Sequence, residues 1–64
     1  MVYIGTLELI TDTPSRYIVR EDGKFLGVVE KYRIKGEKTE RWKSTRLGFV
    51  HGGFRTRKQA AESL

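Results

Sequence analysis

The alternation of apolar and polar residues predicts β-strands along most of this chain. Val2 to Ile10 is rich in β-branched and aromatic residues and predicts a first strand, in which Gly5 marks a bulge or a close backbone approach. Arg16 to Glu21 alternates, so Tyr17 and Val19 share one side. Such period-two patterns are typical of strands that bury one face. The N-terminal half is therefore expected to form a sheet.

Turn-forming residues separate the predicted strands. Thr11 to Ser15 contains a proline, which cannot donate a ladder hydrogen bond, and so predicts a loop. Asp22-Gly23 predicts a two-residue hairpin turn, because glycine supplies the positive φ that a type I′ turn requires. Phe25 to Ile34 then returns as a long strand. Lys35 to Thr39 follows as a polar loop that pivots at Gly36.

The C-terminal third combines strand and helix signals. Glu40 to Arg46 predicts a further strand that holds the only tryptophan. Leu47 to Val50 either continues that strand or forms a short separate piece, and the pattern leaves both possibilities open. His51-Gly52-Gly53 is expected to interrupt the strand, and Phe54 leads into a helix from about Arg57 to Leu64.

The helix has a well-marked start. Thr56 and Gln59 have capping-box spacing, so Thr56 is expected to accept a hydrogen bond from the backbone N–H of Gln59. The Gln59 side chain is expected to accept one from the N–H of Thr56 in return. Ala60, Ala61 and Leu64 then fall on one side of the helix. Small side chains let a short helix lie close to a sheet, so this side is expected to face the strands.

Together these elements predict an α+β fold, with a small antiparallel sheet of three or four strands and one C-terminal helix packed on one face. Residues 1–64 are expected to form a single domain, in which residues 1–15 add a strand and a loop to the sheet and helix of residues 16–64. A domain of this length buries only about 60% of its unfolded surface, so its stability margin is narrow. It contains no cysteine, so no disulfide reinforces it.

The alternation also assigns strand residues to two faces of the sheet. The apolar set expected beneath the helix comprises Tyr17, Val19, Leu26, Val28, Tyr32, Ile34 and Trp42. The opposite, open face is expected to present Arg16, Ile18, Arg20, Phe25, Val29, Lys31, Arg33, Arg41, Lys43 and Thr45. The pattern therefore predicts an open sheet face that is basic and interleaved with a few apolar side chains.

The charge is distributed unevenly along the chain, whose total is +5. Residues 1–30 contain three basic and five acidic side chains. Residues 31–58 contain ten basic side chains and only Glu37 and Glu40 as acids, a net charge of +8. Such a block is typical of a surface that binds a polyanion such as nucleic acid, and the alternative is a solvated basic surface.

The chain offers few residues for catalysis. His51 is the only histidine and has no second metal ligand near it in the sequence. The glycines between Gly48 and Gly53 are not followed by Lys-Ser/Thr, which excludes a phosphate-binding P-loop. We therefore expect no enzymatic activity, no metal and no cofactor. Val2 to Ile10 lacks the basic flank of a signal peptide and is too short to span a membrane, so a cytoplasmic protein without a membrane partner is expected.

The basic open face suggests a way to bind double-stranded DNA. A twisted antiparallel sheet can enter the major groove, where base edges carry a full donor and acceptor code. Arginine can donate two hydrogen bonds to guanine or to a phosphate. The helix start is expected to hold one further phosphate. The predicted contact residues are Arg16, Arg20, Lys31, Arg33, Arg41, Lys43, Thr45, Thr56, Arg57 and Lys58.

Two segments carry a resemblance to a known family. Tyr17 to Phe25 (YIVREDGKF) and Gly53 to Ala61 (GFRTRKQAA) resemble the arm-type DNA-binding domain at the N-terminus of phage and transposon tyrosine integrases. The plant ethylene-response-factor type of domain shares that fold. The resemblance implies a three-stranded sheet on one C-terminal helix, with the open sheet face docked in the major groove. It also implies an origin in a phage or other mobile element, and hence a bacterial or phage-infected host cell.

The chain departs from that family in several respects, among them a longer segment from Leu47 to His51 and a shorter helix. Residues 1–15 have no counterpart in the family pattern, and the catalytic Arg, His and Tyr set of a recombinase is absent. The alternative hypothesis is a small phage-type protein that binds and modulates a host protein without contacting DNA. Val2 to Ile10 would then pair with the partner as an edge strand. Either a monomer or a homodimer is compatible with both hypotheses.

Overall fold

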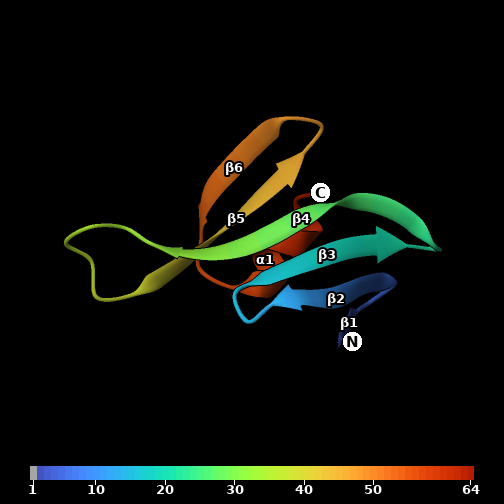
Figure 1. The fold of residues 1–64 in the computed structure, drawn as a ribbon, viewed down its shortest axis with the longest axis horizontal. Helices are drawn as coiled ribbons and strands as arrows, with labels where there is room; N and C mark the ends of the chain where they lie inside the picture. The colour runs from blue at the N-terminus through green and yellow to red at the C-terminus, as the bar shows by residue number, and fades with distance from the viewer. Residues whose placement is uncertain (1) are drawn as a thin grey trace.

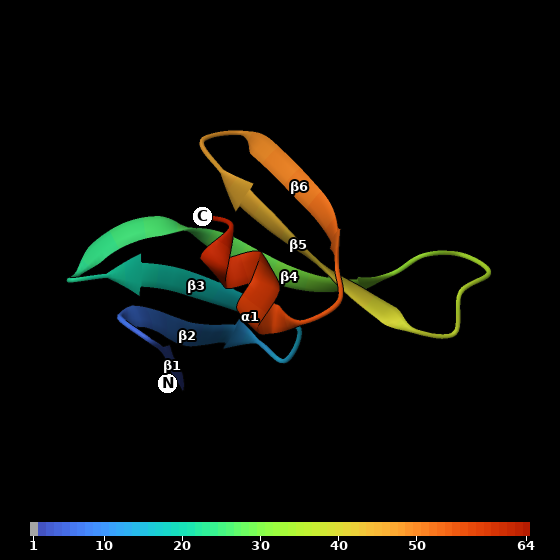
Figure 2. The same cartoon turned by 180° about the vertical axis from the view of Figure 1, so that it is seen from behind.

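The computed structural model describes residues 2–64 and shows a six-stranded antiparallel sheet with one short helix on one face (Figure 1). The strands lie side by side in chain order: β1 Val2–Ile4, β2 Leu7–Thr13, β3 Arg16–Glu21, β4 Lys24–Arg33, β5 Glu40–Arg46 and β6 Phe49–Phe54. The helix α1, Arg57–Glu62, lies across the middle of the sheet and contacts β4, β5 and β6 (Figure 2).

The predicted sheet of three or four strands is wrong, because two chain reversals divide the predicted strands further. Gly5 adopts a φ of 60°, and the chain turns there so that Ile4 pairs with Leu7. Leu47 and Gly48 adopt φ values of 52° and 83° and form a second tight turn. The first reversal splits the predicted N-terminal strand into β1 and β2, and the second separates β5 from β6.

Other strand limits also differ from the prediction. β2 continues to Thr13, so most of the predicted loop from Thr11 to Ser15 is strand. The residues of the predicted break, His51-Gly52-Gly53, lie inside β6. The pairing of β6 with β5 shifts register there, which accommodates the positive φ of Gly53. The Asp22-Gly23 hairpin is confirmed, with positive φ at both residues.

The core is small and lies between the sheet and α1. Leu9, Val19 and Val29 from three adjacent strands are fully buried, together with Ala60 and Ala61 of the helix. Leu64, Trp42, Phe54 and other partly buried apolar side chains surround them. Alanine at both helix positions allows the close approach to the sheet that the sequence predicted.

The predicted face assignment fails within β4. Val19 pairs with Gly27 and Arg20 with Phe25, so Leu26 is an extra residue that forms a β-bulge. A bulge inserts one residue and reverses the alternation beyond it. Val29, Lys31 and Arg33 therefore lie on the helix side of the sheet, whereas Val28 and Tyr32 lie on the open face, opposite to the prediction.

The cap of α1 differs slightly from the predicted capping box. The Thr56 hydroxyl accepts a hydrogen bond from the backbone N–H of Gln59 at 3.1 Å, as predicted. The Gln59 side-chain oxygen accepts from the N–H of Arg55 at 3.1 Å, one residue before the predicted donor. The helix also ends at Glu62 rather than Leu64.

Removing the cap is expected to destabilise the protein measurably. Thr56→Ala leaves the N–H of Gln59 without its acceptor, at a cost of about 1 kcal/mol. In a domain this small, that loss corresponds to a Tm lower by roughly 4–8 °C in a thermal melt followed by circular dichroism. Thr56→Ser keeps the hydroxyl and should melt within a few degrees of the unaltered protein. Equal losses in both variants would contradict the capping role.

Candidate nucleic-acid interface

The basic residues of the open face are matched by carboxylates. Arg20 lies 3.1 Å from Glu8, and Lys43 lies 3.3 Å from Glu30 on the neighbouring strand. Two further ion pairs in this part of the sheet are Arg16 with Asp12 and Arg41 with Glu37. Surface pairs of this kind contribute at most about 1 kcal/mol each, but they cancel the net charge of the face. The open face is therefore a surface of mixed charge, in which carboxylates accompany the cations of the predicted basic face.

Two predicted contact residues lie on the other side of the sheet. The reversal of alternation in β4 places Lys31 and Arg33 on the helix side, where both approach Glu40, at 3.2 Å and 3.6 Å. The structure thus brings together Arg16, Arg20, Arg41, Lys43 and Thr45 on one face and separates Lys31 and Arg33 from them.

Most of the cations without a carboxylate partner occupy a different region. Within residues 2–64, ion pairs involve none of the following basic side chains: Lys24, Lys35, Lys38, Arg46, Arg55, Arg57 and Lys58. Lys35 and Lys38 lie in the loop between β4 and β5, and three more of these residues surround the start of α1. The predicted interface included only Arg57 and Lys58 from this set.

The β4–β5 hairpin, residues 31–42, extends past the rest of the sheet as a two-stranded ribbon beyond its Lys31–Trp42 pair (Figure 1). It carries five basic and two acidic side chains, so it is cationic overall. A small hollow lined by Thr39, Glu40, Arg41 and Arg55 joins the hairpin to the start of α1. Of the unpaired cations Arg55 lines this hollow, whereas Lys58 lines a second hollow between α1 and the β1–β2 turn. We call the unpaired cations of the hairpin and of the helix start together the hairpin–helix surface: Lys35, Lys38, Arg55, Arg57 and Lys58.

Aromatic rings connect the two parts of the hairpin–helix surface. The Lys31 ammonium lies 5.8 Å from the centre of the Trp42 ring, which is 6.0 Å from the ring of Tyr17. The Arg57 guanidinium lies 4.9 Å from the centre of the Tyr17 ring. Cations over ring faces gain about 0.5–1 kcal/mol at exposed sites. This row holds both cationic groups in place; Arg57 keeps an unpaired charge, whereas Lys31 is also paired with Glu40.

Thr56 takes part in capping, since its hydroxyl already accepts from Gln59. The helix has only six residues. The predicted phosphate contact at Thr56 therefore stays a prediction, and the charges of Arg57 and Lys58 are the stronger feature of this segment.

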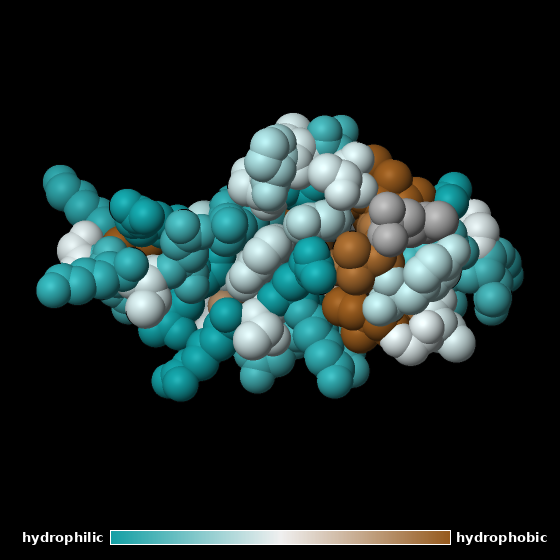
Figure 3. All heavy atoms as spheres, turned by 90° about the horizontal axis from the view of Figure 1, so that it is seen from below, coloured by the Kyte–Doolittle hydropathy of each residue, from teal (hydrophilic) through white to brown (hydrophobic). Residues whose placement is uncertain are grey.

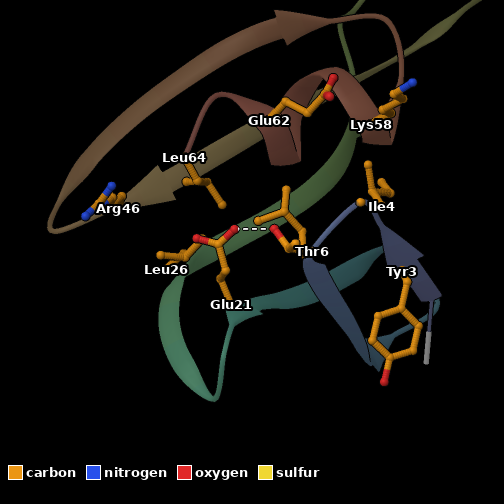
Figure 4. Close-up of a pocket in the computed structure, with 11 residues that line it drawn as sticks. Tyr3, Ile4, Thr6, Glu21, Leu26, Arg46, Lys58, Glu62 and Leu64 are labelled. Carbon is orange, nitrogen blue, oxygen red and sulfur yellow. Dashed lines mark hydrogen bonds between the residues drawn. The ribbon is translucent and has the colours of Figure 1, made fainter.

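Figure 3 shows hydrophilic side chains over the hairpin end of the molecule, while apolar atoms gather at the opposite end. There a hollow lies between α1 and the β1–β2 turn, with Ile4, Leu26 and Leu64 among its apolar lining (Figure 4). Glu21 on its rim accepts a hydrogen bond from Thr6. The lining mixes cations and carboxylates and has no histidine or cysteine, so it offers no arrangement typical of a catalytic site.

The part of the chain that the structure describes contains no group of three or more His, Cys, Asp or Glu side chains suited to a metal ion. The single histidine, His51, is exposed in β6 and not in a loop as predicted. Among residues 2–64, no helix is long and apolar enough to cross a membrane.

The predicted protein-binding strand is only partly available at a sheet edge. β2 lies between β1 and β3, so Leu7 to Ile10 has neighbours on both sides. Only the three residues of β1 remain at that edge. In this sheet order only the β1 part of the Val2 to Ile10 segment lies at the edge, and protein binding through the segment stays a prediction.

Comparisons with known proteins do not indicate a family: no family model matches the chain, and no curated protein or solved structure is significantly similar to it. The resemblance to the integrase arm-type domain stays a prediction.

Proposed function

We propose that this protein is a double-stranded DNA-binding module and that the hairpin–helix surface makes the main contacts. The observation that carries the proposal is the position of the cations without carboxylate partners in residues 2–64, since all of them except Lys24 and Arg46 lie on the hairpin or around the start of α1. Such groups can approach phosphates without first giving up an ion pair, and each phosphate that they neutralise releases counterions condensed on the DNA.

The hairpin has a suitable shape for the DNA contact. The major groove of B-DNA admits a two-stranded β-ribbon, and several DNA-binding proteins place such a ribbon in a groove. Arg33 is 67% exposed on the hairpin and can reach base edges or phosphates. With the hairpin in the groove, Arg55, Arg57 and Lys58 would contact the flanking backbone and fix the orientation of the protein.

The open face would take a smaller part. Arg16, Arg20 and Lys43 would each have to exchange a carboxylate for a phosphate, so their net gain is small. On this face Arg41, which belongs to the hairpin itself, would lie closest to the duplex, and Lys43 and Thr45 would lie progressively further along β5. In this arrangement the contact residues predicted from the sequence form two groups. Those on the hairpin–helix surface would contribute most of the affinity for DNA, and those on the open face would contribute little.

The salt dependence of binding tests the proposal. Five phosphate contacts, from Lys35, Lys38, Arg55, Arg57 and Lys58, correspond to a slope of log K against log salt of about −4.5. Affinity for a labelled 20-base-pair duplex should then fall roughly 500-fold between 50 and 200 mM salt, as measured by fluorescence anisotropy. Absence of binding at 50 mM salt, or binding that does not respond to salt, would contradict DNA binding.

A further inference from the structure

The second edge of the sheet is formed by β6, whose pairing with β5 shifts register between His51 and Phe54. β6 has β5 as its only neighbour in the sheet and contains no charged residue and no proline. Proteins commonly guard an edge strand with a charge or a proline to prevent pairing with other chains. Phe49 and Val50 are 71% and 59% exposed, and Leu47 in the adjoining turn is 86% exposed. Exposed apolar side chains and an unpaired strand edge therefore occur together at β6.

The opposite edge lacks this combination. β1 has only three residues, and Val2 and Ile4 on it pack against the core. Tyr3 is its one large exposed apolar side chain. β6 offers twice the length for pairing, so it is the edge on which another strand would gain most.

We propose that β6 pairs antiparallel with β6 of a second copy of this chain, forming a continuous sheet of twelve strands about a two-fold axis. Each copy carries a net charge of +5, so copies repel one another over most of their surfaces. β6 is the one edge of useful length where two copies can meet without opposing charged side chains. A two-fold interface requires a self-complementary patch, and a neutral apolar strand provides one.

The two-fold axis of such a pair runs perpendicular to the sheet. Antiparallel pairing in a continuous sheet keeps equivalent faces on the same side, so both α1 helices lie on one face of the dimer. The two hairpin–helix surfaces are then presented on that same side. The dimer does not depend on the DNA-binding proposal, but it would let both copies contact one duplex.

The area that the β6 edge can bury sets the expected affinity of the dimer. Stable interfaces bury about 800 Å² per partner, and one strand edge with three exposed apolar side chains supplies less than that. We therefore expect a weak dimer, with a Kd on the order of 100 μM. High salt should strengthen it, because screening reduces repulsion between the two positive chains. DNA binding responds to salt in the opposite direction, so the two proposals can fail separately.

Sedimentation equilibrium without DNA, from 5 μM to 1 mM protein at 0.15 and 0.5 M NaCl, tests the proposal. The average mass should rise from 7.4 kDa toward twice that value, at lower concentration in the higher salt. Val50→Lys adds a charge to the edge at an exposed position and should keep the protein monomeric throughout. Tyr3→Lys, at a similarly exposed position of the other edge, is the matched control and should dimerise normally. Circular dichroism checks that both variants fold.

A second measurement needs no variant. Amide NMR signals of residues 49–54 should shift as the protein concentration rises, while those of residues 2–4 stay fixed. A monomer at 1 mM in both salts would overturn the proposal, as would equal loss of dimer in both variants. Shifts at both edges with growth beyond the dimer would indicate head-to-tail pairing of β1 with β6 and would also overturn it.

Discussion

Gly27→Ala is expected to destabilise the protein by about 3 kcal/mol, which lowers Tm by roughly 12–24 °C. An added Cβ at Gly27 would lie 2.4 Å from the backbone oxygen of Thr45 and 2.8 Å from Cδ2 of Leu64. The oxygen belongs to β5, so it cannot move without disturbing the pairing of β4 with β5. Alanine restricts the unfolded chain more than glycine does, which stabilises the folded state by only about 0.4–1 kcal/mol. This gain does not offset the steric cost of the overlap.

Gly52→Ala provides the matched comparison for Gly27→Ala. Like Gly27, Gly52 has no positive φ, and an added Cβ there would lie 2.9 Å from the hydroxyl of Tyr32. That atom ends a side chain that can shift, although it accepts a hydrogen bond from the N–H of Gly53. We expect a loss of about 1 kcal/mol for Gly52→Ala in the same thermal melts. A Gly27→Ala protein that melts no lower than Gly52→Ala would contradict the steric argument.

Turns with familiar residues could be predicted from the sequence, and unusual ones could not. Asp22-Gly23 has a composition strongly associated with the type I′ turn, and its position was predicted correctly. Leu47-Gly48 adopts similar φ values, but leucine rarely has positive φ, so the pattern left the end of β5 open. The number of strands was underestimated at this turn and at Gly5.

The face assignment shows a limit of local patterns. Alternation within β4 correctly indicates a strand, but whether a residue faces the helix depends on its pairing with β3. The bulge at Leu26 arises from that pairing and reverses the faces of Val29 and Lys31. β3 and β5 have no such extra residue between their core-facing positions, so Val19 and Trp42 were assigned correctly.

The candidate interface was only partly predictable for a related reason. Counting charges located the basic half of the chain, because net charge depends only on composition. Ion pairs depend on cross-strand register, so the neutralisation of Arg20 by Glu8 could not be anticipated from sequence separation. Lys35 and Lys38 had a local signal, since only Glu37 accompanies them in their loop. Neither lysine lies in a predicted strand, so the interface predicted on the strands does not include them.

Lys35→Ala/Lys38→Ala is expected to weaken DNA binding roughly 200-fold at 50 mM salt and roughly 20-fold at 200 mM salt. These values follow if each lysine contacts one phosphate, because each contact contributes about 0.9 to the salt slope. The slope should accordingly become less steep by about 1.8. Both residues lie in an exposed loop outside the core, so the thermal melt should be unchanged within a few degrees.

Two controls connect this loss to the hairpin–helix surface. Lys24→Ala removes one unpaired cation at the β3–β4 turn, at the end of the molecule away from the hairpin, and should change affinity only slightly (Figure 1). Arg16→Ala/Lys43→Ala removes two cations that are paired on the open face and should cost far less than the lysine pair. Equal losses in the two double variants would show that the hairpin makes no preferred contact, and a larger loss in the open-face variant would show that the duplex lies against the open sheet face. The hairpin would then contribute charge without entering the groove, because only direct contact makes one pair of cations matter more than another of equal number.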